Sequence, residues 1–267
     1  MRSFKIVILR EQSLCYYHLI SLNGVSIDKK KIIAFGLVRI IEKGRTAWME
    51  GLRVHPRYKR RGLGAFITKY NAGLSASQGV ERVRLITELD NEISPKLPRL
   101  IGMSKRLTMN YLWKKNIGDR LSQESSEFHR ATPEKVFTLL SNLPGLVPRN
   151  LLFYNWYALD LTRANLVALD KTVTFWIGTR DAKTVSLCLG LRTTGPRGSE
   201  WCCTIYAQDR SAFVSTLRFQ IRIMKKNRLS DLLCIHPPKF HSAIPQIPQL
   251  QKRTYLLKFG LFERNLR

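Results

Sequence analysis

The sequence has few acidic residues and no long apolar stretch. Only 19 of its 267 residues are Asp or Glu, against 45 Lys and Arg, so the formal net charge is +26. No apolar run approaches the roughly 20 residues that a membrane-spanning helix needs, and the apolar residues 6–9 are too few for a secretory signal. We therefore expect no membrane partner, and a cytoplasmic location with the nucleus as the alternative.

The cysteines and histidines lack the spacing of a disulfide framework or a metal site. The five cysteines stand at positions 15, 188, 202, 203 and 234, without a Cys-x-x-Cys pair. An odd number with one adjacent pair favours buried, reduced thiols in strands. His55, His129, His236 and His241 show no paired spacing either, so we expect structural or solvent-facing roles for them and no metal site.

The excess of positive charge would attract nucleic acid and other polyanions through its long-range field. The cations are nevertheless scattered, and no run exceeds three residues, as at 29–31 and 59–61. The sequence shows no aromatic RNA-binding motif, zinc-finger spacing or heptad array. A basic, nucleic-acid-associated protein is therefore an alternative, and nucleic acid is not expected to be the main partner.

The most informative stretch is residues 50–64, which read EGLRVHPRYKRRGLG. A predicted strand over residues 47–54 turns at His55 and Pro56 into a basic loop with two glycines, which leads directly into a predicted helix. The free N–H groups and the dipole of a helix start favour an anion, and glycine allows close backbone approach. The spacing fits neither a dinucleotide-binding fingerprint nor a Walker loop. It predicts a pyrophosphate site formed by Lys59, Arg60, Arg61, Gly62, Leu63, Gly64 and Ala65.

The segments on both sides of this loop extend the pattern. Residues 32–40 and 46–54 alternate like two strands, and residues 42–45 (Glu-Lys-Gly-Arg) suit a hairpin turn between them. Residues 80–87 predict a further strand, followed by a short helix that ends near Gly102.

This order of hairpin, phosphate loop, helix, strand and helix resembles the core of the GCN5-related N-acetyltransferases (GNAT superfamily). Residues 44–56 and 90–94, with Tyr-Leu-Leu at 255–257, resemble its histidine N-acetyltransferase branch, and the detailed match covers about residues 31–110. The resemblance implies an α/β (α+β) fold with a GNAT-type mixed sheet flanked by helices. It also implies transfer of acetyl from acetyl-CoA to a small-molecule amine, namely the α-amino group of L-histidine.

The resemblance assigns roles to residues of the strand before the loop. Glu50 would act as the base that accepts the proton of the amine; the alternative is a structural carboxylate paired with Arg53 or a charge at the sheet edge. The backbone of Leu52 and Val54 would bind the pantetheine arm, and Arg53 belongs to the same cofactor-binding segment.

Two further residues match the superfamily's Asn-x-x-Ser pattern after the next strand. Asn91 would contact pantetheine and Ser94 the phosphate side. Many members place a tyrosine six to seven residues after that asparagine as the acid for the leaving thiolate, but Leu97 and Pro98 stand here. We therefore name no catalytic acid.

The composition changes at the polar residues 122–127, which predicts a domain boundary near 122. Residues 1–122 would be the acetyltransferase domain, with an incomplete N-terminal part, because residues 4–10 and 15–22 read as two strands without the expected helices. Residues 123–267 would form a smaller α+β extension. It opens with a helix capped by Thr132 and is either a degenerate GNAT-like repeat or an unrelated domain. Its predicted strands cover residues 151–159, 173–178, 185–191, 201–207, 232–235 and 254–262, with a helix over residues 211–226.

Three functions are compatible with these patterns. The first is an acetyl-CoA-dependent N-acetyltransferase. The second is a catalytically weak or inactive acetyl-CoA-binding protein, which the short N-terminal part and the missing acid favour. The third is the basic nucleic-acid-associated protein.

Overall fold

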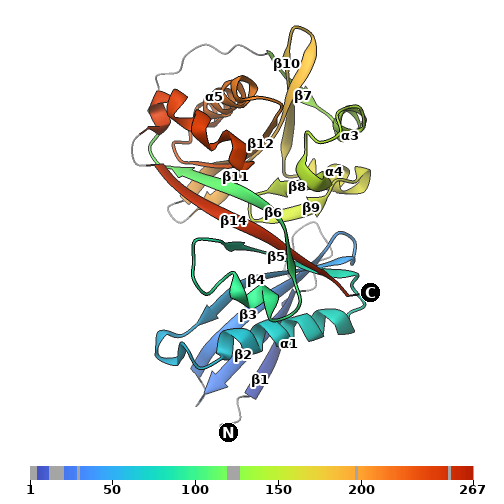
Figure 1. Cartoon of the computed structure of the whole chain (residues 1–267), viewed down its shortest axis with the longest axis vertical. Coiled ribbons are helices and arrows are strands. Elements are labelled where there is room, and N and C mark those ends of the chain that lie inside the picture. The colour runs from blue at the N-terminus through green and yellow to red at the C-terminus, as the bar shows by residue number, and fades with distance from the viewer. Residues whose placement is uncertain are drawn as a thin grey trace. The chain divides into compact units, whose positions relative to one another are not determined.

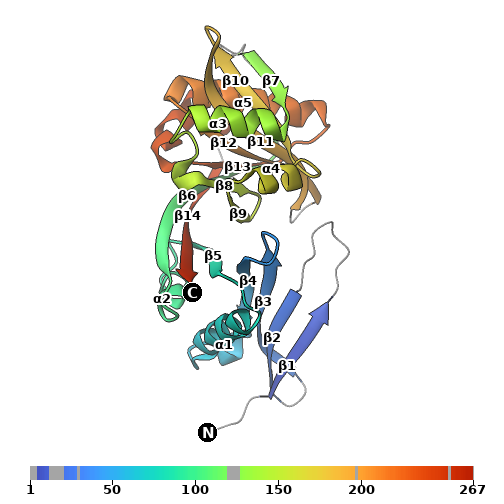
Figure 2. The ribbon, with the colours of Figure 1, turned by 90° about the vertical axis from the view of Figure 1, so that its right-hand side faces the viewer.

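The computed structural model describes residues 5–11, 21–28, 31–118, 127–195, 198–251 and 254–266 (Figures 1 and 2). The chain divides into two compact units. The first contains residues 1–107 and 260–267, and the second contains residues 108–259. No helix in these ranges is long and apolar enough to cross a membrane.

The first unit is built on a mixed sheet. Its strands β1 to β4 are antiparallel neighbours in chain order, and β5 is parallel to β4. The C-terminal part of β14 follows β5 in the strand order. The elements are β1 (Lys5–Glu11), β2 (Ser21–Asp28), β3 (Lys31–Ile41), β4 (Thr46–Val54), a 3-10 turn (Pro56–Tyr58), α1 (Leu63–Ser77), β5 (Arg82–Glu88) and α2 (Lys96–Arg99).

The predictions for this unit are confirmed except at its beginning. The hairpin between β3 and β4 turns at Glu42, Lys43 and Gly44, all with positive φ. Most of the expected strand 15–22 lies outside the described residues, and β2 was not predicted. The helix before Gly102 is reduced to four residues, because it contains Pro98, which cannot donate a backbone hydrogen bond.

Helix α1 lies along one face of β2, β3 and β4 (Figure 1). In β3 and β4, Val38 and Ile40 and then Ala47 and Met49 are alternate residues that point to that face, as a strand period of two requires, and they pack with Ala72 of the helix. A second buried cluster contains Ile33 and Ala34 of β3 with Leu63 and Ile67 of α1.

A β-bulge interrupts the ladder between β3 and β4. Leu37 pairs with Glu50 and Phe35 pairs with Arg53, so β4 contains one residue more than β3 over this step. Gly51 has a φ of +66°, a conformation that glycine adopts at little cost. Strand β4 pairs with β5 only over residues 46–48 and 82–84. The two parallel strands therefore separate toward the bulge.

The second unit also contains a mixed sheet, with the order β14-β6-β13-β12-β11-β10-β7 and one parallel pair, β12 and β13. Helix α5 packs on one face, against β11 and β12, and α3 and α4 lie on the other (Figure 2). The strands are β6 (Ser104–Lys114), β7 (Glu127–Ala131), β8 (Leu151–Tyr154), β9 (Tyr157–Asp160), β10 (Thr174–Arg180), β11 (Lys183–Gly195), β12 (Gly198–Ala207), β13 (Leu232–His236) and β14 (Thr254–Asn265). The helices are α3 (Pro133–Asn142), α4 (Arg163–Leu169) and α5 (Arg210–Lys226), with 3-10 segments Pro148–Asn150, Pro238–Gln246 and Pro248–Leu250.

The two units share one order of elements. In the first, the antiparallel pair β3 and β4 is followed by α1 and by β5 parallel to β4. In the second, the antiparallel pair β11 and β12 is followed by α5 and by β13 parallel to β12. This repetition favours the interpretation of the second unit as a repeat of the same fold.

The compact units do not coincide with the boundary expected near residue 122. Strand β6 runs from the first unit into the second, and β14 brings the C-terminal residues back into the first. Local sequence patterns contain no signal for such long-range strand pairing. The expected strand 151–159 is in fact two strands, because Asn155 (φ +48°) turns the chain between β8 and β9.

A buried ion network holds the last strand in the first unit. Arg84 is 1% exposed and donates to Glu42 in the hairpin turn (3.2 Å) and to Glu263 in β14 (2.7 Å). Arg106 also lies 3.4 Å from Glu263. Since an uncompensated buried charge is costly, the network holds the β3–β4 turn, β5 and β14 in one arrangement.

We expect Arg84→Met to lower the free energy of unfolding of the first unit by about 3–5 kcal/mol, because two buried carboxylates lose the buried cation that they share. Arg45→Met is the matched control. Arg45 pairs with Glu81 at the surface, and its loss should cost at most about 1 kcal/mol. Urea unfolding measures both changes, and equal effects would contradict a structural role of the network.

In the second unit, His236 is fully buried. Its Nδ1 lies 3.0 Å from the carbonyl oxygen of Pro237, and its ring packs on Phe213. Burial lowers the pKa of His236 to about 4, and nearby His241 adds to that direction. The expected structural role of this histidine is thus consistent with its place in the core.

This histidine should make the second unit sensitive to acid. An unfolded histidine has a pKa near 6.5, so between pH 6.5 and pH 4 the unfolded state binds the proton preferentially, and stability falls as pH falls. Between pH 7 and pH 5, the free energy of unfolding of the natural chain should fall by about 2 kcal/mol more than that of His236→Phe. The exposed His129 serves as control: His129→Phe should keep the natural pH dependence. If His236→Phe also kept it in urea unfolding, the account of His236 would be wrong.

Candidate active site

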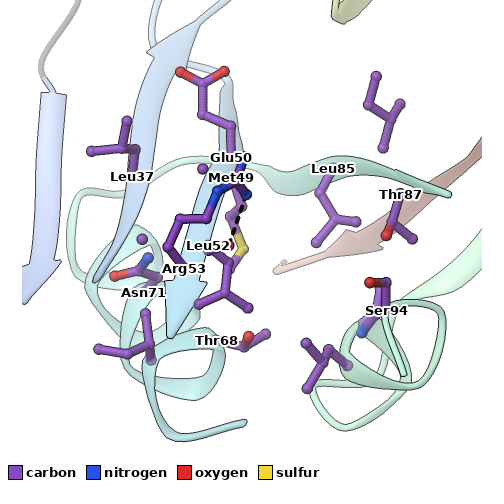
Figure 3. A pocket seen from close by; sticks show the side chains of 16 residues that line it. Leu37, Met49, Glu50, Leu52, Arg53, Thr68, Asn71, Leu85, Thr87 and Ser94 are labelled. Atoms are coloured by element: carbon purple, nitrogen blue, oxygen red, sulfur yellow. Dashed lines mark hydrogen bonds between the residues drawn. The ribbon is translucent and has the colours of Figure 1, made fainter. Parts of the chain in front are cut away.

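A cavity of about 210 Å³ lies where β4 and β5 separate (Figure 3). Its walls come from β3, the bulge of β4, α1, β5 and the loop before α2, all in the first unit. Thr68 and Asn71 of α1 stand on one side, and Leu85, Thr87 and Ser94 stand across from them (Figure 3). The local break in strand pairing thus creates a binding space inside the sheet.

Glu50 precedes the bulge and lines this cavity. Its neighbour Met49 belongs to the core beneath α1, so the side chain of Glu50 points to the opposite face of the sheet. The carboxylate forms an ion pair with Arg39 and keeps 22% of its side-chain surface exposed. Arg53, which the sequence offered as an alternative partner of Glu50, does not pair with it. The Arg53 side chain donates instead to the carbonyl oxygen of Leu52 (3.0 Å).

The bulge exposes main-chain groups to the cavity. Gly51, Leu52 and Arg53 all line it. The extra residue of a bulge has no place in the ladder, so its main-chain groups can bind a ligand instead. Val54 has returned to the ladder opposite Ala34 and does not line the cavity.

Helix α1 begins beside the cavity with its first turn uncapped by any side chain. Gly62 occupies the N-cap position with a left-handed φ of +78°, and the first turn contains no acidic residue. A Cβ on Gly64 would stand within 3.9 Å of Leu52 and Leu97, both of which line the cavity. The N–H groups of Leu63, Gly64 and Ala65 and the helix dipole can therefore bind an anion at the cavity edge.

The predicted cations of the loop surround this helix start. Lys59, Arg60 and Arg61 are exposed. Arg60 has a left-handed φ of +61°, and the Arg61 guanidinium lies 5.2 Å from the centre of the Tyr58 ring. This arrangement is suited to a phosphorylated ligand.

Of the two residues predicted beyond β5, one lines the cavity. Ser94 does so, whereas Asn91 is exposed and its Oδ1 accepts the N–H groups of Ile93 (3.0 Å) and Ser94 (2.9 Å). Asn91 therefore shapes the loop. Leu97 and Pro98 also line the cavity, so the positions that often carry the acid present apolar side chains.

Sequence reasoning missed several residues of the cavity, namely Gly36, Gly51, Thr68, Asn71 and Thr87. Two of them carried a signal. Thr68 and Asn71 follow Gly64 at helical spacing on the buried face of α1, where polar residues are unusual. The bulge glycine was not recognisable, because the extra residue becomes apparent only from the pairing with β3.

The corresponding helix start of the second unit is closed. Only Gln208 and Asp209 separate β12 from α5, and Asp209 caps the helix by accepting the N–H of Ala212 (2.7 Å). Asp209 also pairs with Arg180, and these hydrogen bonds lower its pKa. A capped helix start with a carboxylate disfavours an anion.

Aromatic rings fill the space beside that helix start. Phe213 stacks on Phe240 with ring centres 4.9 Å apart and lies 5.1 Å from His236. All three side chains are at most 2% exposed. The second unit therefore keeps the order of elements, while aromatic side chains occupy the space beside its helix start.

No group of three or more His, Cys, Asp or Glu in the described ranges could hold a metal ion. Cys188, Cys202, Cys203 and Cys234 are free and buried in strands of the second unit, as predicted, and Cys15 lies outside the described residues. Burial raises the thiol pKa of Cys188, Cys202 and Cys203. These thiols are unreactive in the folded chain.

Among the comparisons with known proteins, the family model covers part of the first unit, whereas the solved structures cover most of the chain. Residues 5–103 match the family model described as "Acetyltransferase (GNAT) family", a family that generally uses acetyl-CoA. No curated protein matches the sequence.

Solved structures resemble the fold. A GCN5-related N-acetyltransferase from Sphaerobacter thermophilus matches with a TM-score of 0.63 and 11% identity, covering 92% of this chain and 81% of that chain. A tandem GNAT protein from the clavulanic acid biosynthesis pathway matches with a TM-score of 0.55 and 11% identity, covering 93% and 84%. A GCN5-related N-acetyltransferase from Anabaena variabilis ATCC 29413 matches with a TM-score of 0.46 and 11% identity, covering 92% of this chain. This chain spans 63% of the length of that protein.

At these identities the solved structures show similarity of fold alone. The match to the GNAT family model is confined to residues 5–103, which lie in the first unit.

Proposed function

We propose that the first unit is an acetyl-CoA-dependent N-acetyltransferase that acts on a small-molecule amine. The observation that carries this proposal is the bulge at Gly51. It opens one cavity between the uncapped start of α1 and the carboxylate of Glu50. An anion site and a base on opposite sides of one opening suit a phosphorylated acyl donor and an amine acceptor.

The donor would extend from the helix start into the cavity. Residues 59–65 supply N–H groups and cations for the pyrophosphate, and the main chain of Leu52 and Arg53, which line the cavity, supports the pantetheine arm. Ser94 faces the same cavity, and Asn91 orders the loop that presents it. Lysine at position 59 contributes charge without the forked donor of an arginine.

Glu50 would take the proton of the amine. The nitrogen then bonds to the thioester carbon, the carbon–sulfur bond breaks, and the thiolate leaves with a proton from its surroundings. A main-chain N–H at the bulge can stabilise the negative charge that develops on the thioester oxygen. Arg39 holds the carboxylate in place, and we assign no side chain as the acid.

L-Histidine is the acceptor that the sequence resemblance favours. Arg53 is exposed at the cavity and could bind the substrate carboxylate, and its cross-strand partner Phe35 is 36% exposed beside it. These side chains offer a cation and an apolar surface near Glu50.

The chain would contain one active centre. The first unit, residues 1–107 and 260–267, would carry it, and the second unit would have no cofactor site at its corresponding helix start, because Asp209 and Phe213 occupy that space.

A second candidate is an acyl-CoA-binding protein with little or no transferase activity. Leu97 and Pro98 favour it, because they line the cavity where many relatives carry the acid. Activity and binding separate the two candidates.

Millimolar CoA should raise the melting temperature of the natural chain, because a ligand that binds the folded state stabilises it by mass action. Gly62→Val should abolish this shift, since the valine side chain would block the approach to the helix start. Gly79→Val is the matched control: Gly79 also has a positive φ (+70°) and open surroundings, at the other end of α1. Both variants should lose stability, and only Gly62→Val should lose the response to CoA. No shift in the natural chain would contradict donor binding.

Glu50→Gln should lower the rate of histidine acetylation by about 10²- to 10⁴-fold at pH 7, the usual size of general-base catalysis. Its CoA affinity should barely change, and the deficit should shrink as pH rises toward the pKa of the amine. Glu81→Gln, which removes a surface carboxylate paired with Arg45 and Arg82, should retain full activity. A fully active Glu50→Gln variant would place the base elsewhere, and CoA binding without activity in the natural chain would favour the second candidate.

A further inference from the structure

One polar atom in the cavity has no partner. Asn71, in α1, lines the cavity and is 2% exposed, and its Oδ1 is buried without a hydrogen-bond donor (Figure 3). A buried carbonyl oxygen that has left water without gaining a donor destabilises the folded state. Such an atom in a binding cavity calls for a donor from outside the chain.

Nearby hydroxyl groups of α1 are already used. Thr68 donates to the carbonyl oxygen of Gly64 (2.8 Å), and Ser75 donates to the carbonyl oxygen of Asn71 (2.7 Å). Ile67, which meets the same point above Gly36, is apolar. Thr87 and Ser94 also line the cavity, but neither donates to this oxygen, which remains without a partner.

The opposite strand keeps room for the amide. A Cβ on Gly36 would lie 2.9 Å from Cγ2 of Ile67 and 3.0 Å from Nδ2 of Asn71. Gly36 stands in β3 opposite the bulge. Any larger residue would force Ile67 or the amide of Asn71 to shift, so Gly36 and Asn71 form one feature of the site.

We propose that Asn71 binds the acyl donor by accepting a hydrogen bond from an N–H or O–H group of that ligand. This inference rests on the proposed function. Two parts of an acyl-CoA can supply the donor: an amide N–H of the pantetheine arm, or a hydroxyl on the acyl group. Asn71 is thus a ligand-binding residue on the α1 side of the cavity, whereas Glu50 points to the other face of the sheet.

Asn71→Leu tests the proposal because leucine has a similar volume and no polar atom. A residue that merely supported the fold would lower stability when replaced. The unpartnered oxygen predicts the reverse: the melting temperature of the free chain should stay the same or rise. The affinity for the donor should fall by roughly five- to tenfold, the factor for one neutral hydrogen bond.

Calorimetric titrations with CoA, acetyl-CoA and 3-hydroxybutyryl-CoA distinguish the two sources. An equal loss for all three ligands identifies the pantetheine amide. A loss confined to 3-hydroxybutyryl-CoA identifies the acyl group and makes Asn71 a determinant of acyl specificity. Ser75→Ala is the control, because Ser75 is equally buried in α1 without lining the cavity; all three affinities should remain those of the natural chain.

Unchanged affinities in Asn71→Leu, with the natural chain binding CoA, would overturn this inference and leave the proposed function standing. Lower stability of the free variant with unchanged affinities would assign Asn71 to the fold alone. If the natural chain bound none of the three ligands, the inference and the proposed function would both fail.

Discussion

The candidate site depends on one extra residue in β4. Between the pairs Leu37–Glu50 and Phe35–Arg53, β4 advances by three residues while β3 advances by two. Gly51 therefore adopts a left-handed φ, and β4 leaves the regular pairing. The pairing of β4 with β5 ends after residue 48, and the cavity opens between them. Glu50, the last residue before the bulge, points to the face away from α1, and Leu52, just after it, lies near Gly64 at the helix start. The proposed base and the proposed main-chain contacts to the acyl donor thus flank one local irregularity.

The second unit shows what the same order of elements becomes when the binding features are absent. Both units contain a hairpin, a helix and a parallel strand. The first begins its helix with Gly62 and no acidic residue, whereas the second begins it with Asp209 as the cap. Phe213, Phe240 and His236 then occupy the adjoining space. Equivalent topology therefore does not imply equivalent chemistry, and under the proposed function the helix start would decide which unit binds a phosphorylated ligand.

The sequence predicted the parts of the fold that depend on local patterns. The β3–β4 hairpin, the glycine-bearing start of α1, β5, and the capped helices α3 and α5 all have short-range signals in turn residues, caps and periodicity. Three features lack such signals. The division of β6 and β14 between the two units depends on long-range pairing, the bulge depends on the register with β3, and the Glu50–Arg39 pair joins residues of different strands. The site was therefore predictable where it is a loop and a helix start, and unpredictable where it depends on strand register.

With the proposed function, one phosphorylated acyl donor binds at the start of α1 and none binds at the start of α5. Hydrogen exchange of the natural chain, with and without saturating acetyl-CoA, distinguishes the two helix starts. We expect protection of amides in residues 51–54 and 62–66, with unchanged exchange in residues 208–213. Protection at the start of α5, or none at the start of α1, would contradict the proposal.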